Sequence, residues 1–558
     1  MKYIFLLISL FTFNFLQAQV TGVVKDAAGE PIPGANVFWM NTTNGVTTNE
    51  DGNFSIHKPA RSHMLVVSFI GFENDTIHVD KGNQQLDIVL REGVELSEVN
   101  VVTRKLGTMK LRTSVMNEDM ISSAELTRAA CCNLGESFVT NPSVDVSYSD
   151  AATGAKQIKL LGLSGTYVQM MTENIPNFRG AAAPYGLGYV PGPWMQSIQV
   201  SKGSSSVKNG YESITGQINV EFKKPQLPEA DWVSANLFAS STNRYEANAD
   251  ATVKLSKRWS TSLLAHYENE TKSHDSNDDG FVDIPRVEQY NVWNRWAYMG
   301  DHYVFQAGIK ALHETRNSGQ IAHGNTPSHD LYEIGIKTNR YEAFTKNAYI
   351  FDKEKNTNLA LILQGTLHNQ DANYGRKLYD VDQSNFYASL LFETELSKQH
   401  SLSAGLSFNY DGYDQNYRLT NQAEEGLTKK FVKESVPGAY VQYTFNLNDQ
   451  LMLMGGIRGD YSSEYGFFVT PRAHVKYNPN EYLHFRLSAG KGYRTNHVLA
   501  ENNYLLASSR KMKIASHLDQ EEAWNYGASV STYIPLFGKT LNVNAEYYYT
   551  DFLKQVVV

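Results

Sequence analysis

Two groups of side chains in this 558-residue chain have the chemistry to bind metal ions. Its two cysteines, Cys131 and Cys132, are adjacent, and Met170, Met171 and Met195 follow in the same region. Thiolate and thioether sulfur atoms prefer soft ions such as Cu(I). The same residue types also pack cores, because methionine fills gaps and free cysteine is commonly buried. The sequence therefore leaves two interpretations open, a soft-metal site and ordinary core packing.

A second group carries oxygen ligands. Asp275, Asn277, Asp279 and Asp283 occupy positions one, three, five and nine of a calcium-type loop, and glycine stands at position six. Position twelve is Arg286, where such a loop needs a bidentate glutamate. The segment is therefore either a loop stabilised by calcium or an Asp/Asn-rich turn. Calcium is the only cofactor that the sequence suggests.

Other chemistry is not indicated. We find no constellation typical of a nucleophilic enzyme or a metal hydrolase, so the sequence predicts no enzyme. The formal charge of -8 and the pI near 6.0 give no basic footprint for nucleic acid.

The first residues predict export. Met1 and Lys2 supply a short positive region, residues 3–16 are largely apolar, and Ala18 ends a small-residue cleavage site. We expect a signal peptide over residues 1–18 and a mature chain that starts at Gln19.

The second half of the chain has the period of membrane-spanning strands. In residues 245–255 the odd positions are Tyr, Ala, Ala, Ala, Val and Leu, and the even positions are Glu, Asn, Asp, Thr and Lys. The pattern recurs at 303–311, 402–410 and 541–549. Such alternation predicts an antiparallel β-barrel with lipid outside and a polar lumen. A mean hydropathy of -0.39, without long apolar runs after residue 20, disfavours membrane helices.

Connections of two lengths separate these strands. Short turns such as 256–258 and 446–450 are expected on the periplasmic side, and long ones such as 269–290 and 315–332 on the extracellular side. We place His313, His323 and His329 in one long connection, where they either contact a substrate or metal or are simply solvated.

Three phrases between residues 157 and 225 resemble the plug domain of TonB-dependent outer-membrane receptors. They are Lys-Leu-Leu-Gly-Leu at 159–163, Glu-Asn-Ile-Pro at 173–176, and the segment from Ile198 to Gly210, in that order. Gly-Lys-Gly-Tyr-Arg-Thr-Asn at 490–496 is similar to a barrel phrase of the same family, with Asn496 in place of the usual proline.

The N-terminal module resembles a second known domain. Short apolar stretches from residue 20 to residue 90, separated by Gly, Pro and Asn/Asp turns, predict a small β-sandwich. Its opening phrase is similar to that of the carboxypeptidase-regulatory-like domain often found before such receptors. We expect a folding or interaction module.

The segment between sandwich and plug resembles the family's TonB box: Leu96, Ser97, Glu98, Val99, Asn100 and Val101. An extended segment of this kind can add a strand to a partner's sheet. The resemblance implies TonB, with ExbB and ExbD, as partner. A last sandwich strand or a plain linker is the alternative.

The predicted fold is all-β with a small α+β plug. We expect a signal peptide at 1–18, a β-sandwich at 19–91, a linker with the box at 92–108, a plug at 109–225 and a transmembrane barrel at 226–558. We count roughly fifteen or sixteen candidate strands, whereas plugged transporter barrels have about 22. The sequence therefore predicts an incomplete barrel whose C-terminal strands are missing.

The resemblance implies active uptake of a scarce solute across the outer membrane, driven by the TonB complex. A metal ion or metal chelate is one substrate class, with copper favoured by the Cys/Met group. Siderophore, haem, cobalamin and glycan are alternatives. A surface-binding receptor or adhesin without transport is the competing function.

Overall fold

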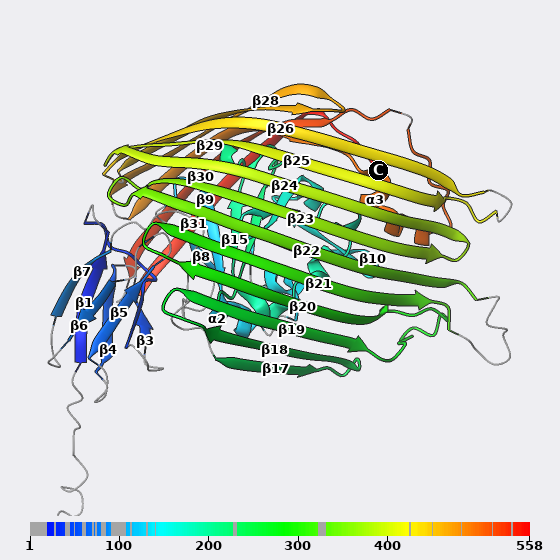
Figure 1. Cartoon of the computed structure of the whole chain (residues 1–558), viewed down its shortest axis with the longest axis horizontal. Helices are drawn as coiled ribbons and strands as arrows, with labels where there is room; N and C mark the ends of the chain where they lie inside the picture. Colours follow the sequence, from blue (N-terminus) through cyan, green and yellow to red (C-terminus); the bar gives the residue numbers. More distant parts are fainter. Residues whose placement is uncertain are drawn as a thin grey trace, which may run out of the picture. The chain divides into compact units, whose positions relative to one another are not determined.

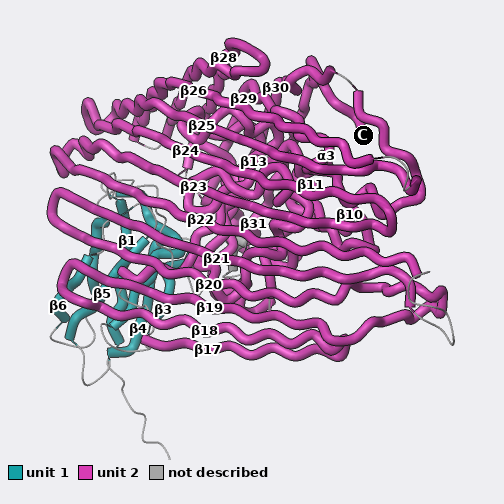
Figure 2. The backbone as a smooth tube through the Cα atoms, turned by 45° about the vertical axis from the view of Figure 1, so that its right-hand side comes forward, with its two compact units in different colours: residues 1–105 teal, residues 106–558 magenta. Residues whose placement is uncertain are grey.

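The fold is described from a computed structural model of the whole chain. The described residues are 19–26, 29–39, 45–49, 51–58, 63–69, 72, 75–79, 85–90, 108–111, 114–129, 132–139, 141–226, 232–321, 331–422, 426–448, 450–480, 482–515, 517–536 and 539–558. They fall into two compact units, Met1–Lys105 and Leu106–Val558 (Figure 2).

The first unit is a sandwich of two small sheets. One sheet has the strand order β4-β1-β7 and the other β3-β2-β5-β6. A single apolar cluster takes side chains from both sheets, including Val24 and Ile56 from one and Trp39 and Leu65 from the other. The strands are β1 (Gln19–Lys25), β2 (Asn36–Trp39), β3 (Gly45–Thr47), β4 (Asn53–His57), β5 (Met64–Ser68), β6 (Asp75–His78) and β7 (Gln85–Val89).

The second unit begins with the plug, which contains a six-stranded and a three-stranded sheet. The larger has the order β14-β13-β16-β15-β9-β8 and the smaller β10-β11-β12. The strands are β8 (Thr108–Lys110), β9 (Asn117–Ser122), β10 (Val144–Asp150), β11 (Ala155–Leu160), β12 (Leu163–Ser164), β13 (Val168–Thr172), β14 (Ile175–Pro176), β15 (Met195–Lys202) and β16 (Gly216–Phe222).

Short helices join these strands. The α-helix α2 (Ser123–Arg128) begins at Ser122, whose side chain caps it by accepting from the Glu125 amide. The 3₁₀ turns are η1 (Leu134–Phe138), η2 (Gly165–Tyr167), η3 (Gly180–Ala182), η4 (Gly186–Tyr189), η5 (Gly192–Trp194) and η6 (Val207–Asn209).

Fifteen antiparallel strands, in sequence order from β17 to β31, form the wall around the plug (Figure 1). This number lies within the range counted from the sequence. The strands are β17 (Val233–Ala239), β18 (Arg244–Lys254), β19 (Trp259–Glu270), β20 (Arg286–Met299), β21 (Tyr303–Gly319), β22 (Glu333–Asp352), β23 (Thr357–Tyr374), β24 (Lys377–Ser397), β25 (His400–Arg418), β26 (Thr428–Leu447), β27 (Leu451–Ser462), β28 (Gly466–Asn480), β29 (Leu483–Arg494), β30 (Glu521–Leu536) and β31 (Lys539–Lys554). Between β29 and β30 lie α3 (Val498–Glu501) and η8 (Asn503–Ala507).

The wall has the alternation expected from the sequence. On β22, Tyr341 and Tyr349 are exposed on the outer face, whereas Thr338 and Arg340 are buried toward the plug. The predicted fold of sandwich, plug and antiparallel wall is confirmed. No helix in the described part of the chain is long and apolar enough to cross a membrane.

Several strands of the wall are longer than a bilayer requires. β22 has 20 residues and β24 has 21, whereas a spanning strand needs about 9–11. The extra length lies partly in segments predicted as connections. β21 continues to Gly319, so His313 is a strand residue that bonds Asn339 across to β22. The prediction of a loop position for His313 is wrong; His323 and His329 lie outside the described residues.

Candidate functional site

Several predicted site residues lie outside the described residues. These are the signal peptide, the whole box from Leu96 to Val101, and Cys131. Their roles stay predictions.

Cys132 is a buried cysteine that lies two residues before η1. Its backbone amide donates to Glu136 Oε2 at 3.1 Å, and its carbonyl accepts from the Gly192 amide at 2.8 Å. Burial and the nearby carboxylate of Glu246 raise the pKa of the Cys132 thiol. The thiol is therefore in its protonated form at neutral pH.

The three methionines lie on two strands of the larger plug sheet. Met170 and Met171 are successive residues of β13, so their side chains point to opposite faces of the sheet. Met195 lies two strands away, where it pairs with Phe222 of β16, whereas Met171 pairs with Asn219. Met171 and Met195 are buried. Met170 and Met171 therefore do not both face one ion, and binding of a soft metal by the cysteines with one of the methionines stays a prediction.

The calcium-like segment is a compact turn between β19 and β20. Asp275 accepts from the amides of Asp279 and Gly280 at 3.1 and 2.9 Å, and Asp283 accepts from the Ser276 amide at 2.7 Å. This last bond lowers the pKa of the Asp283 carboxyl. The side-chain amide of Asn277 donates to the carboxylate of Asp279 at 2.9 Å. Among the described residues, no group of three or more His, Cys, Asp or Glu is placed to hold a metal, so calcium binding by this turn stays a prediction.

The Glu-Asn-Ile-Pro phrase forms the turn from β13 to β14, and it contacts the wall. Glu173 and Asn174 have φ values of 51° and 59°. The Asn174 amide donates to Asn219 Oδ1 at 2.7 Å, which fixes this left-handed turn against β16. The buried Glu173 carboxylate lies 2.5 Å from Arg295 of β20. The phrase therefore ends in an ion pair between plug and wall.

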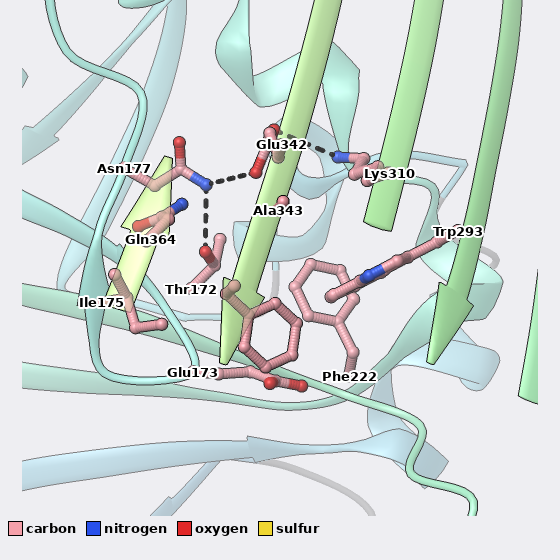
Figure 3. A pocket seen from close by; sticks show the side chains of 11 residues that line it. Thr172, Glu173, Ile175, Asn177, Phe222, Trp293, Lys310, Glu342, Ala343 and Gln364 are labelled. Atoms are coloured by element: carbon pink, nitrogen blue, oxygen red, sulfur yellow. Dashed lines mark hydrogen bonds and ion pairs between the residues drawn. The ribbon is translucent and has the colours of Figure 1, made fainter. Parts of the chain in front are cut away.

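A cavity of about 20 Å³ lies beside this turn, lined by Thr172, Glu173, Asn177, Trp293 and Lys310, among others (Figure 3). That volume holds about one water molecule. It is too small for a solute of the size expected for uptake.

One carboxylate of β22 organises the wall next to the cavity. Glu342 accepts from Arg340 Nε at 2.7 Å. It also accepts from Asn177 Nδ2 of the plug at 3.0 Å (Figure 3). Lys310 Nζ lies 3.8 Å from the same carboxylate. The same Asn177 Nδ2 also donates to Thr172 Oγ1 at 3.0 Å. The plug side of the cavity is therefore joined to two wall strands by polar contacts.

The next plug segment makes a second charged contact. Arg179 lies 2.5 Å from Glu212 of the plug and 3.2 Å from Asp411 of β25. Gly180 follows with φ of 58°, and a Cβ there would lie 2.4 Å from the Tyr413 hydroxyl. Only glycine fits this close approach of plug and wall without strain.

A third contact is made by an arginine that meets plug carbonyls. Arg472 of β28 is buried and donates to the backbone oxygens of Ser205, Ser206, Tyr211 and Ser213 at 3.0 to 3.4 Å. The planar guanidinium suits several fixed acceptors at once. Arg472 thereby holds the plug segment 205–213 against the wall.

A fourth contact links the plug sheet to β31. Lys202 of β15 lies 2.8 Å from both Asp119 and Glu546, and Lys110 lies 2.9 Å from Glu546. Burial opposes the charge on Lys202, but Asp119 and Glu546 outweigh it and raise the pKa of this lysine. Lys202 therefore stays charged in the interface.

Sequence reasoning missed these interface residues because each is an isolated charge on an alternating strand. Their positions could have pointed to them, because Glu173, Arg179 and Lys202 lie in or next to the plug phrases. Their partners on the wall are separated from them by 122 to 344 residues, and no local pattern announces the pairing.

Three domain families match the chain. Residues 20–102 match a CarboxypepD_reg-like domain, residues 110–217 a TonB-dependent receptor plug domain, and residues 316–557 a TonB-dependent receptor-like β-barrel. The chain belongs to the family of TonB-dependent outer-membrane receptors. This family consists of transport receptors, so the expectation of a receptor rather than an enzyme is confirmed at the level of the family.

Curated relatives carry the same family name. The chain is 28% identical over 245 residues to the TonB-dependent receptor SusC of Bacteroides thetaiotaomicron, a match over 41% of this chain and 24% of SusC. It is 39% identical over 100 residues to the TonB-dependent receptor P39 of Formosa agariphila, over 17% of this chain and 10% of P39. The matched parts thus span a quarter or less of these relatives.

Solved structures show the same fold. The alcaligin outer-membrane receptor FauA of Bordetella pertussis has a TM-score of 0.60 at 14% identity, over 82% of this chain and 76% of FauA. The siderophore receptor PirA of Acinetobacter baumannii has a TM-score of 0.61 at 14% identity, over 78% of this chain and 70% of PirA. At such identities the likeness concerns the fold alone.

Proposed function

We propose that this protein takes up a scarce solute across the outer membrane by TonB-driven displacement of its plug. The observation that supports this most is the plug's contact with the wall, which includes Arg179 with Asp411, Lys202 with Glu546, and Arg472 with four plug carbonyls. Such groups are hydrated when they separate, so each contact contributes only about 0.5–3 kcal/mol net. A plug held in this way is firmly seated and still removable by a pulling force.

The direction of transport follows from the connections. Short turns lie at one end of the strands, such as 255–258 and 300–302, and the long connections 271–285 and 495–520 lie at the other. Short turns are periplasmic in outer-membrane barrels. The solute would therefore enter from the side of the long connections, and TonB, energised by ExbB and ExbD, would pull the box at Leu96 to Val101 from the periplasm.

Deletion of residues 96–101 from the receptor, expressed in its native cells, tests this proposal. We expect uptake to be lost while the variant receptor stays in the outer membrane and binds the solute at the cell surface. Deletion of the four residues 41–44, which lie outside the box, serves as the control and should preserve uptake. Uptake that survives the box deletion would favour the surface-binding receptor or adhesin instead.

For the substrate we propose a metal or metal chelate, with Cu(I) and ferric siderophores as the first two probes. Cu(I) is suggested by the adjacent thiols of Cys131 and Cys132 in the sequence, and the siderophores by the ligands named for FauA and PirA. Haem, cobalamin and glycans complete the panel. Anaerobic Cu(I) titration of a Cys131→Ser, Cys132→Ser variant tests the copper part: unchanged affinity would exclude these thiols as ligands.

A further inference from the structure

The connection between β29 and β30 folds onto the plug. It spans residues 495–520 and contains α3 and η8. Helix α3 packs against η3 of the plug, and Leu499, Ala500 and Leu506 belong to the same apolar cluster as Ala181 and Ala182 of η3. One of the long connections of the wall therefore contributes side chains to the core of the plug.

Asn503 joins three parts of the molecule at one side chain. Its Oδ1 accepts from the hydroxyl of Tyr185, a plug residue, at 3.2 Å and from the hydroxyl of Tyr374, on β23, at 2.9 Å. Its Nδ2 donates to the Ala500 carbonyl at 2.8 Å. Asn503 and Tyr374 are fully buried and Tyr185 is nearly so. Loss of this amide would remove the acceptor that the two buried hydroxyls share.

The wall holds the same connection from its outer side. Tyr332 donates to the Ala507 carbonyl at 2.8 Å, and Lys377 Nζ donates to the carbonyls of Ser508 and Arg510 at 2.6 and 2.8 Å. Residues 508–511 themselves are exposed. The connection therefore presents one side to the solvent and fixes the other to the plug.

A ring contact reinforces the junction next to η3. The His497 and Tyr413 rings lie 4.3 Å apart between centroids, and Tyr413 is the residue that approaches Gly180 of the plug. Any shift of residues 497–507 must therefore disturb both the Asn503 bonds and the wall beside η3. Packed contacts of this kind move between discrete arrangements rather than continuously.

We propose that residues 497–510 form a latch that couples the solute-facing end of the receptor to the plug, with Asn503 as its positioning residue. A solute that contacts the exposed side of the latch changes the stability of plug residues 180–189 through this amide. The plug in turn changes the stability of the latch, because coupling between two sites is reciprocal. This inference rests on the proposed function for its direction, but the coupling itself is measurable without any solute.

Hydrogen exchange of the full-length receptor in lipid nanodiscs tests the coupling in both directions. We expect Asn503→Ala to increase amide exchange of residues 180–189 about tenfold, and Tyr185→Phe to increase exchange of residues 498–507 by a smaller factor. Asn502→Ala is the matched control, because the Asn502 side chain donates to Val498 within the same connection. Asn502→Ala removes no bond to the plug or to β23, so it should change the exchange of residues 180–189 much less than Asn503→Ala does.

A purely structural role would not give this pattern. If Asn503→Ala loosens only its own connection, or if Asn502→Ala has the same effect on the plug, the latch is excluded. Tyr374→Phe keeps the proposal testable if Asn503→Ala does not fold, and it should loosen both 180–189 and 498–507. Uptake after deletion of residues 96–101 is measured separately, so a failure of TonB-driven transport is distinguished from a failure of coupling.

Discussion

The wall meets the plug in two different ways along its circumference. Strands β19–β25, here called the apolar wall, contribute Leu264, Trp293, Leu312, Ile336, Tyr374 and Tyr413, among others, to the main apolar cluster of the plug. Among the described residues, strands β26–β31, the polar wall, contribute buried side chains to two small apolar clusters with the plug, and Val432 of β26 packs at the margin of the main cluster. Their main contacts are charged groups such as Arg472 and Glu546.

Under the proposed function, the difference predicts the order in which the plug would separate from the wall. Separating apolar surfaces costs about 25 cal/mol for each Å² exposed to water, whereas polar groups regain hydrogen bonds with water. We therefore expect the plug to separate first from the polar wall and to stay longest on the apolar wall. The latch at Asn503 would strengthen the contact of the plug with the apolar wall, since Tyr374 belongs to that wall.

The largest effect is expected from Trp293→Ala on the apolar wall. The Trp293 ring meets Phe222 of the plug edge to face at 4.5 Å and is almost fully buried. Truncation of a buried aromatic side chain costs about 3–5 kcal/mol. Hydrogen exchange of β16 measures the loss.

Trp296→Ala is the matched control, because Trp296 lies on the same strand with its ring exposed on the outer face. Equal effects of the two substitutions on β16 would show that the apolar wall does not hold the plug.

The next largest effect is expected from Arg472 on the polar wall. Arg472→Met removes the donors to the plug carbonyls of residues 205–213, and hydrogen bonds from a charged group contribute about 1.5–3 kcal/mol. We expect faster exchange of residues 205–213 with little change at β16. Arg472→Lys should restore little, because an ammonium group lacks the planar fork. Full recovery with lysine would mean that charge alone holds this segment.

The sequence predicts the strands of the wall far better than its contacts with the plug. Alternation in residues 245–255 depends on local burial, so it predicts β18 and the polarity of each face. The pairing of Arg295 with Glu173 depends on how β20 and the plug meet in space. No local pattern carries that information.

The same distinction between sequence neighbours and spatial neighbours applies to the Cys/Met group. Met170 and Met171 are neighbours in sequence, which suggested common ligands, but a strand sends successive side chains to opposite faces. His313 shows the opposite error, since β21 extends beyond the length that a bilayer requires.

A smaller effect, dependent on pH, is expected where η1 meets β18. Burial opposes ionisation of Glu136, but Arg244 at 2.9 Å and Lys156 outweigh it and hold the pKa of that carboxyl below its ordinary value of 4.5. A lowered pKa stabilises the folded state above the ordinary value, and this contribution is lost as the pH falls below it. We expect the protection factors of residues 132–139, which correct for the slower intrinsic exchange in acid, to fall below about pH 4.5.

Glu136→Gln tests the assignment, because the amide cannot titrate. The variant should be less stable at neutral pH, by about 1 kcal/mol or less for a partly exposed pair, and should lose the additional change on acidification. If the acid response persists in the variant, another carboxyl causes it.

The smallest effect is expected at the turn of residues 275–283. This turn lies between the end of β19 and the start of β20. Its carboxylates already accept the turn's own amides, as from Asp279 and Gly280 to Asp275, so the turn does not depend on an ion for its shape. Calcium would therefore stabilise the turn only weakly, with a dissociation constant in the range of about 0.1–1 mM known for extracellular modules.

We predict slower proteolysis of residues 271–285 in millimolar Ca²⁺ than in chelator, and no change in the hydrogen exchange of β16. Asp279→Asn should reduce this protection, whereas Asp278→Asn, at a position that is not a ligand in such loops, should not. Identical proteolysis with and without Ca²⁺ would leave the segment as an Asp/Asn-rich turn, and the difference between the two walls would then account for plug retention without any contribution from this loop.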